Sequence, residues 1–185
     1  MRKVTLGLAN SLDNYIARKN DGVDWLRWSK EVAEISAKFM KTVDAILIGR
    51  KTYEVMLKSG EASFPGGTNY VFSRSKRNRT SLLRKIAAIK KPDANVHVIS
   101  ENAASFVRKL KKVKGKGIVI FGGGKLAKSL LEANLIDEIV LNVHPVLLGS
   151  GIPLFHEMKR QIDLEFVSSR QLRTGAVILS YRVTH

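Results

Sequence analysis

The sequence predicts an α/β fold in one domain, residues 1–185, with a mostly parallel central sheet and an antiparallel hairpin at its C-terminal end. Over the first two thirds of the chain, short apolar runs alternate with segments whose apolar residues recur at helical spacing. Strands that alternate with helices pair in parallel, because each helix carries the chain back to the same end of the sheet. In the last third, two strand-like runs flank Thr174-Gly175, which indicates a hairpin.

The first elements follow from residue patterns read in chain order. Residues 3–9 form an opening strand, and residues 44–48 (Asp-Ala-Ile-Leu-Ile) are typical of a strand buried on both faces. Farther on, Leu82, Ile86 and Ile89 recur at helical spacing. Strands are predicted at residues 3–9, 44–48, 68–73, 95–99, 117–121, 136–144, 163–172 and 175–183. Helices are predicted at residues 29–42, 51–58, 80–90, 102–113 and 124–134.

Composition narrows the class of protein. The 185 residues are 44% hydrophobic, enough to bury one core, and no linker or repeat divides them. The chain has no cysteine, which excludes disulfides and thiolate metal sites and fits a cytoplasmic location. We expect no signal peptide and no membrane span, since there is no long apolar segment. The histidines at 97, 144, 156 and 185 are scattered, so no metal site is predicted.

The formal net charge of +16 is concentrated in the middle of the chain. Between Arg74 and Lys116 there are fourteen Lys or Arg and two acids, Asp93 and Glu101. Such a stretch attracts polyanions, whether nucleic acid or a phosphorylated small molecule. The sequence does not favour a dedicated nucleic-acid role, because the chain has no zinc or helix-turn-helix signature and no strand of stacking aromatics.

Two glycine-containing turns stand where a strand leads into a helix. Gly122, Gly123 and Gly124 follow the run 119–121, and Gly49 follows the run 44–48. Residues without a Cβ let backbone N–H groups approach a phosphate, and the positive end of the next helix points to the same place. Each turn can equally be an ordinary tight βα turn. Ser73-Arg74, after a third strand, offers a hydroxyl and a guanidinium at the same sheet edge, where ligands of open α/β sheets bind.

Five motifs extend over nearly the whole chain. They are residues 9–17 (Ala-Asn-Ser-Leu-Asp-Asn-Tyr-Ile-Ala), 48–54 (Ile-Gly-Arg-Lys-Thr-Tyr-Glu), 72–74 (Phe-Ser-Arg), 121–126 (Phe-Gly-Gly-Gly-Lys-Leu) and 145–155 (Pro-Val-Leu-Leu-Gly-Ser-Gly-Ile-Pro-Leu-Phe). In this order they resemble the dihydrofolate reductase-like superfamily, specifically the group that contains the reductase domain of the bifunctional riboflavin-biosynthesis deaminase-reductase.

The resemblance implies a three-layer α/β/α domain and an NADPH-dependent oxidoreductase. It would transfer hydride to a small heterocycle, pteridine-like or similar to the aminopyrimidine of the riboflavin pathway. Ser73 and Arg74 would hold the 2′-phosphate, which favours NADP(H) over NAD, since a guanidinium suits a phosphomonoester. A homodimer is implied through the 145–155 region. The cofactor residues implied are Ala9, Trp25, Gly49, Arg50, Lys51, Thr52, Ser73, Arg74, Gly122, Gly123, Gly124, Lys125 and Leu126.

The substrate side departs from the resembling enzymes. Riboflavin-pathway reductases have an acidic Asp-Asp-Pro segment after the second turn and a Glu before the glycine turn, where this chain has residues 55–60 and Phe121. Dihydrofolate reductases place a carboxylate on the first helix. By spacing, Glu34 is the candidate here, with Glu31 next. Glu34 would need burial to raise its pKa, and the alternative is an exposed residue paired with Lys38.

Three further residues lie near the expected site. Asp13 is a candidate catalytic residue and also fits a turn-forming role beside Asn14, which tolerates the left-handed conformation. Trp25 is expected to close over the nicotinamide as a lid, whereas Trp28 is expected in the core. Two other functions remain open: a nucleotide-binding module without turnover, and a polyanion or nucleic-acid binder.

Overall fold

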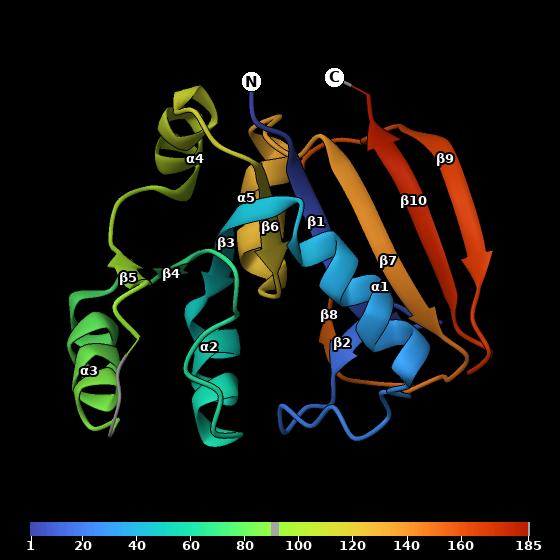
Figure 1. The fold of residues 1–185 in the computed structure, drawn as a ribbon, viewed down its shortest axis with the longest axis horizontal. Coiled ribbons are helices and arrows are strands. Elements are labelled where there is room, and N and C mark those ends of the chain that lie inside the picture. Colours follow the sequence, from blue (N-terminus) through green and yellow to red (C-terminus); the bar gives the residue numbers. More distant parts are fainter. Residues whose placement is uncertain (90–92, 185) are drawn as a thin grey trace.

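An eight-stranded sheet forms the centre of the computed structural model, which describes residues 1–89 and 93–184 (Figure 1). The strand order is β5-β4-β3-β6-β1-β7-β10-β9. The strands from β5 to β7 run parallel, and β10 pairs antiparallel with both β7 and β9. The strands are β1 (Val4–Ser11), β3 (Val43–Gly49), β4 (Thr68–Phe72), β5 (Val96–Ile99), β6 (Gly117–Phe121), β7 (Glu138–His144), β9 (Leu164–Gln171) and β10 (Val177–Val183). The predicted α/β fold with a closing hairpin is confirmed.

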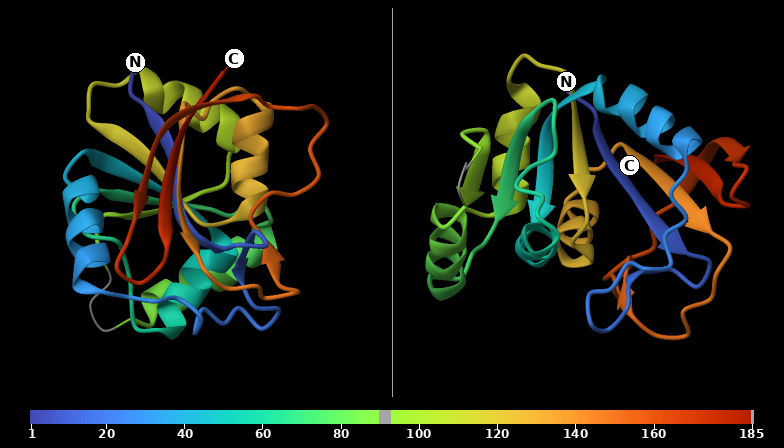
Figure 2. Two further views of the ribbon diagram at one scale, coloured as in Figure 1. Left: turned by 90° about the vertical axis from the view of Figure 1, so that its right-hand side faces the viewer. Right: turned by 60° about the horizontal axis from the view of Figure 1, so that its bottom comes forward.

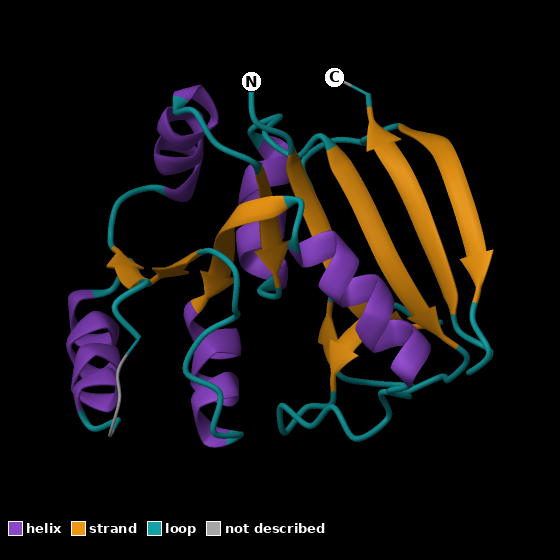
Figure 3. Ribbon diagram, in the orientation of Figure 1, coloured by secondary structure: helices purple, strands orange, loops and turns teal. Residues whose placement is uncertain are grey.

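Helices cover both faces of the sheet, as the views in Figures 2 and 3 show. They are α1 (Lys30–Met40), α2 (Arg50–Lys58), α3 (Lys76–Ala87), α4 (Ala103–Lys112) and α5 (Gly124–Glu132). Residues of β3 alternate between two apolar cores: Leu47 packs in the core that contains α5, and Ile46 and Ile48 pack in the core that contains α2 and α3. This alternation explains why the run 44–48 is almost entirely apolar. Among the described helices, none combines the length and apolarity needed to cross a membrane.

A second, two-stranded sheet is not expected from the sequence. It consists of β2 (Tyr15–Ala17) and β8 (Ile152–Pro153), which pair antiparallel. Strands this short carry no usable periodicity, so their pairing depends on the tertiary fold. The small sheet holds the turn after β1 against the loop that follows β7.

Helix α3 begins four residues before the predicted start at residue 80. The Ser75 side chain accepts a hydrogen bond from the Asn78 N–H and so caps the helix at this earlier position. The end of the predicted helix, residue 90, lies outside the described residues, and so does His185.

Helix α1 packs on the hairpin side of the sheet. Val32 forms an apolar cluster with Leu172 and Ala176 of the β9–β10 connection. Glu31 accepts hydrogen bonds from the Arg173 N–H at 3.0 Å and from Arg170 Nη2 at 2.9 Å. These hydrogen bonds hold the pKa of Glu31 below its usual value, with the Arg173 backbone N–H as the largest cause. Glu31 is therefore a carboxylate that ties α1 to the hairpin.

Candidate active site

The two glycine turns face each other at the carboxyl ends of β3 and β6, which are neighbours in the sheet. A Cβ on Gly49 would lie 3.2 Å from the Gly123 Cα, and a Cβ on Gly122 would lie 2.7 Å from the Thr52 Cγ2. Gly122 and Gly123 also adopt positive φ angles of 70° and 94°. Close approach and left-handed backbone both require glycine here, and the prediction that these turns bind an anion stays a prediction.

The two helices that start at these turns differ from the other three in their N-caps. The N-termini of α1, α3 and α4 are capped by the side chains of Ser29, Ser75 and Asn102. The N-caps of α2 and α5 are Gly49 and Gly123, which provide no side-chain hydrogen bond. The first-turn N–H groups of these two helices therefore remain available to an anion at the sheet edge.

Basic side chains surround the paired turns. Lys51 and Lys125 are exposed in the first turns of α2 and α5. Arg50 forms an ion pair with Glu54 one helical turn later, and Lys85 Nζ lies 2.8 Å from the other oxygen of Glu54. Arg50 is thus held along α2 by its own helix.

Ser73 and Arg74 follow β4 at the same edge. Arg74 is exposed, whereas Ser73 is buried, and its Oγ has no hydrogen-bond partner within residues 1–89 and 93–184. The guanidinium of Arg74 is therefore the group of this pair that can reach a ligand from solvent.

The two tryptophans differ in burial from what the sequence predicts. Trp28 is 71% exposed, so its predicted place in the core is wrong. Trp25 is buried, and its ring meets the edge of His144 at 5.4 Å between ring centroids. The Arg27 N–H donates to His144 Nδ1 at 3.3 Å, which anchors the segment between the two tryptophans. Trp25 packs against His144 in this conformation, its expected role as a lid stays a prediction, and the exposed indole belongs to Trp28.

Glu34 is exposed on α1, which contradicts the burial expected of a catalytic carboxylate there. Val32, two positions earlier, is buried in the cluster with the hairpin, and 100° of rotation per residue places Glu34 well away from it. Glu31 is engaged with the hairpin. Neither carboxylate of α1 is directed to the site.

Asp13 organises a turn. It accepts hydrogen bonds from the Ser11 hydroxyl at 2.6 Å and from the N–H groups of Leu148 and Gly149 at 3.1 and 2.7 Å. The Ser11 hydroxyl is the largest cause of a pKa below the usual value for this carboxyl. Asn14 has a φ of 69°, as its side chain allows. Asp13 therefore joins the turn after β1 to the loop after β7, and its candidate catalytic role stays a prediction.

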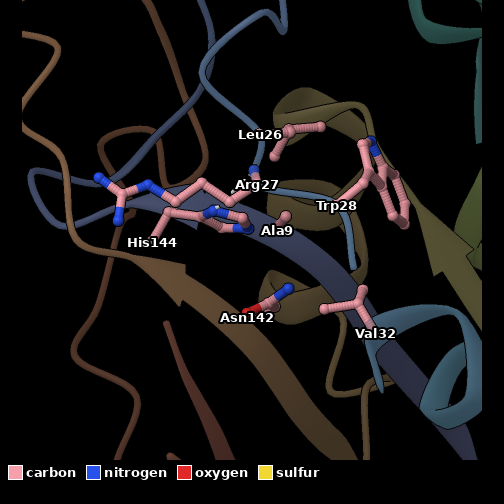
Figure 4. A pocket seen from close by; sticks show the side chains of 7 residues that line it. All are labelled: Ala9, Leu26, Arg27, Trp28, Val32, Asn142 and His144. Atoms are coloured by element: carbon pink, nitrogen blue, oxygen red, sulfur yellow. Dashed lines mark hydrogen bonds between the residues drawn. The ribbon is translucent and has the colours of Figure 1, made fainter. Parts of the chain in front are cut away.

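A cavity opens where β1 and β7 approach α1 (Figure 4). Ala9 comes from β1, Asn142 and His144 come from β7, and the opposite wall is formed by the segment before α1 and its first turn. The lining residues are Ala9, Leu26, Arg27, Trp28, Val32, Asn142 and His144. Burial lowers the pKa of His144, with a smaller contribution from Arg27, so its imidazole is neutral near pH 7.

Sequence reasoning missed Asn142. Its Oδ1 is buried and has no hydrogen-bond partner in the described part of the chain. In the sequence, Asn142 is a single amide in the otherwise apolar stretch Ile139 to Val143. An amide in a strand also occurs on solvated faces, so this pattern alone does not identify a site. Among the described residues, no three His, Asp or Glu side chains lie close enough together to hold a metal ion.

The fold and the paired glycine turns define a dihydrofolate reductase-like α/β domain. Residues 2–178 match the model of the RibD C-terminal domain, and the chain belongs to this family. Membership of the family supports a reductase-type function.

Particular relatives agree with this membership. The chain is 36% identical over 172 residues to the uncharacterized protein YwjB of Bacillus subtilis, covering 92% of each chain. It is similar in structure to a Shewanella sp. PV-4 protein whose name ascribes it to riboflavin biosynthesis, with a TM-score of 0.78, 24% identity and full coverage of both chains. It also resembles the dihydrofolate reductase of Enterococcus faecalis, with a TM-score of 0.68, 17% identity and coverage of 99% and 97%. The last two likenesses show the fold.

Proposed function

We propose that this protein is an NADPH-dependent reductase that transfers hydride to a small heterocyclic substrate. The observation that carries the proposal is the pair of facing glycine turns, from which two helices start without side-chain caps. The absence of Cβ atoms lets the two turns pack closely, so the N-termini of α2 and α5 lie near each other and can bind phosphate together. The Enterococcus faecalis dihydrofolate reductase, which shares the fold, is described as a complex with NADP(H).

The residues at the turns fit this cofactor. First-turn N–H groups at residues 50–52 and 124–125 would bind its pyrophosphate, and Lys51 and Lys125 would add positive charge. The exposed Arg74 would bind the 2′-phosphate. Bound NADPH would supply the hydride, and the protein would orient it toward the substrate and exclude water.

The test is calorimetric binding of NADPH and NADH to the wild type and to Arg74→Ala. We expect NADPH to bind at least about tenfold more tightly than NADH, because a charged hydrogen bond contributes about 1.5–3 kcal/mol. Arg74→Ala should remove this preference and leave NADH binding unchanged. The matched control is Arg108→Ala, which removes an exposed arginine of α4 and should keep the preference for NADPH over NADH.

Two results would favour the other functions. NADPH binding without NADPH oxidation across a panel of heterocycles would indicate a nucleotide-binding module. Binding of arbitrary duplex DNA with a steep salt dependence, without competition from NADPH, would indicate a polyanion binder that uses the basic stretch 74–116. The cytoplasmic location stays a prediction from composition.

We further infer a homodimer through the loop after β7. Leu147 and Leu12 are 69% and 65% exposed, and the Leu12 N–H donates to the Val146 carbonyl at 2.9 Å, so the two side chains come from adjoining segments. A second copy of the chain is the occupant that would cover them. Light scattering should give a dimer for the wild type and a monomer for Leu147→Asp; a monomeric wild type would contradict the inference.

A further inference from the structure

The cavity beside α1 lies at the same edge of the sheet as the paired glycine turns. Ala9 of β1 is paired in register with Asn142 of β7, and β1 is itself the neighbour of β6. Paired residues of adjacent strands project to the same face, so the small Ala9 side chain leaves space above the Asn142 amide. Figure 4 shows this amide on the floor of the cavity, between His144 and Val32.

The polar groups of the cavity are neutral apart from Arg27. Asn142 brings one amide with an unpartnered buried Oδ1. His144 Nδ1 accepts the Arg27 N–H, so the proton of the neutral imidazole resides on Nε2. Within the described residues, no carboxylate lines the cavity. An amide presents one acceptor and one donor side by side, and this pair matches a ring that presents an N–H next to a carbonyl.

Building on the proposed reductase function, we propose that Asn142 determines substrate specificity by binding the lactam edge, a ring N–H beside a C=O, of a neutral planar heterocycle. Asn142 Oδ1 accepts the ring N–H, and its Nδ2 donates to the ring carbonyl. Leu26, Val32 and Ala9 line the cavity with apolar side chains, which suit an uncharged ring.

The size of the cavity indicates how the ring is held. Its volume is about 20 Å³, room for about one water molecule, so only the polar edge of a ring enters it. The body of the ring then lies outside, beside the indole of Trp28, which is 71% exposed and lines the mouth. Stacking on an exposed indole gives this side chain a role that packing does not explain.

The charge of the site disfavours the opposite chemistry. A ring with a protonated amidine edge, such as the cation of a 2,4-diamino heterocycle, donates from both positions and is bound best by a carboxylate. Glu34 is exposed and Glu31 is bound to the hairpin, whereas Arg27 contributes a positive charge at the wall. The site therefore prefers the lactam to the amidine.

The test compares two rings of the same shape, pteridine-2,4-dione and pteridine-2,4-diamine, at a pH at which the free diamine is protonated. Binding is measured by calorimetry and by quenching of tryptophan fluorescence, on full-length protein saturated with NADP⁺. The wild type should bind the dione at least tenfold more tightly. Asn142→Asp should reverse the order, because a carboxylate accepts from both positions of the diamine. Asn78→Asp, an amide-to-acid change on α3, should leave the order unchanged. If Asn142→Asp does not fold, Asn142→Ala should bind both rings with equal weakness.

Separate outcomes overturn the specificity proposal and the proposed function. If NADPH binds but Asn142→Asp leaves the ring preference unchanged, the specificity role of Asn142 is wrong and the reductase proposal stands. If Asn142→Leu raises the thermal midpoint and ring binding is unaffected, the Asn142 amide is an unsatisfied buried group that binds no ring, and the specificity proposal is wrong. If NADPH itself does not bind, the proposed function fails. Ring binding is then measured without nucleotide, so that the role of Asn142 is tested separately.

Discussion

At the ends of β3 and β6 the edge of the sheet is formed by main-chain atoms, whereas at the ends of β1 and β7 it is formed by side chains. The first region consists of two local turns, each contiguous in sequence, that meet through Gly49, Gly122 and Gly123. The second region assembles Ala9, Val32 and Asn142 from three segments. A site made of backbone can bind a ligand common to many proteins, while a site made of side chains can change its substrate through single substitutions.

The contact between the glycine turns is the most sensitive point of the first region. Gly122→Ala should reduce the free energy of unfolding by about 2–5 kcal/mol, since it adds left-handed strain of about 1–2 kcal/mol to overpacking of about 1–3 kcal/mol against Thr52. NADPH affinity should fall with it, as the turns separate. Chemical denaturation and calorimetry measure the two effects.

Gly149→Ala is the matched control for this substitution. Gly149 has nearly the same φ, 69°, but no atom lies within 4 Å of the position that its Cβ would take. The Gly149→Ala variant should therefore lose only the free energy of unfolding that corresponds to the left-handed strain, about 1–2 kcal/mol, and it should bind NADPH as the wild type does. Equal decreases in the free energy of unfolding for Gly122→Ala and Gly149→Ala would show that the two facing glycine turns can separate without loss of stability.

In the second region, the stabilising effect of Asp13 should decrease at acidic pH. The pKa of this carboxyl is lowered in the folded protein, so its stabilising effect is present above the pKa of an unfolded Asp and is lost as the pH falls through the folded value. Asp13→Ala should lower the thermal midpoint at pH 7, less than Gly122→Ala does. The difference from wild type should shrink toward pH 3, and a difference independent of pH would contradict this role.

His144 should cause a smaller change in stability, at a less acidic pH. Its folded pKa is lowered by burial, so the unfolded chain takes up a proton first and stability decreases as the pH falls below the ordinary histidine value of about 6.5. His144→Gln retains an acceptor for the Arg27 N–H and cannot titrate. Its thermal midpoint should therefore decrease less than that of wild type between pH 7 and pH 5.

Glu34→Gln should have the smallest effect. The side chain is exposed and outside both regions, so turnover of NADPH should stay within about twofold of wild type and stability within about 0.5 kcal/mol. A large loss of turnover with unchanged NADPH affinity would instead make Glu34 a catalytic carboxylate. Steady-state kinetics with the ring that binds best decides between these results.

Particular residues show where sequence reasoning reaches its limit. Gly49 and the glycines at 122–124 can be identified from sequence because a glycine between a strand and a helix is a local pattern. The sequence pattern places Trp28 in the core wrongly, since both tryptophans follow the same turn and only tertiary contacts show that Trp25 is the buried one, against His144. Asn142 cannot be identified from the sequence, because its oxygen becomes buried without a hydrogen-bond partner only in the folded structure.

The order of strands and helices, the closing hairpin and the glycine turns are determined by the sequence itself, because periodicity, β-branched runs and missing Cβ atoms act over a few neighbouring residues. Tertiary structure alone decided that Gly49 meets Gly123, that β2 pairs with β8, and that Asn142 faces a cavity. These contacts join residues far apart in the chain, and the packing of the whole sheet determines which side chains are buried at its edge.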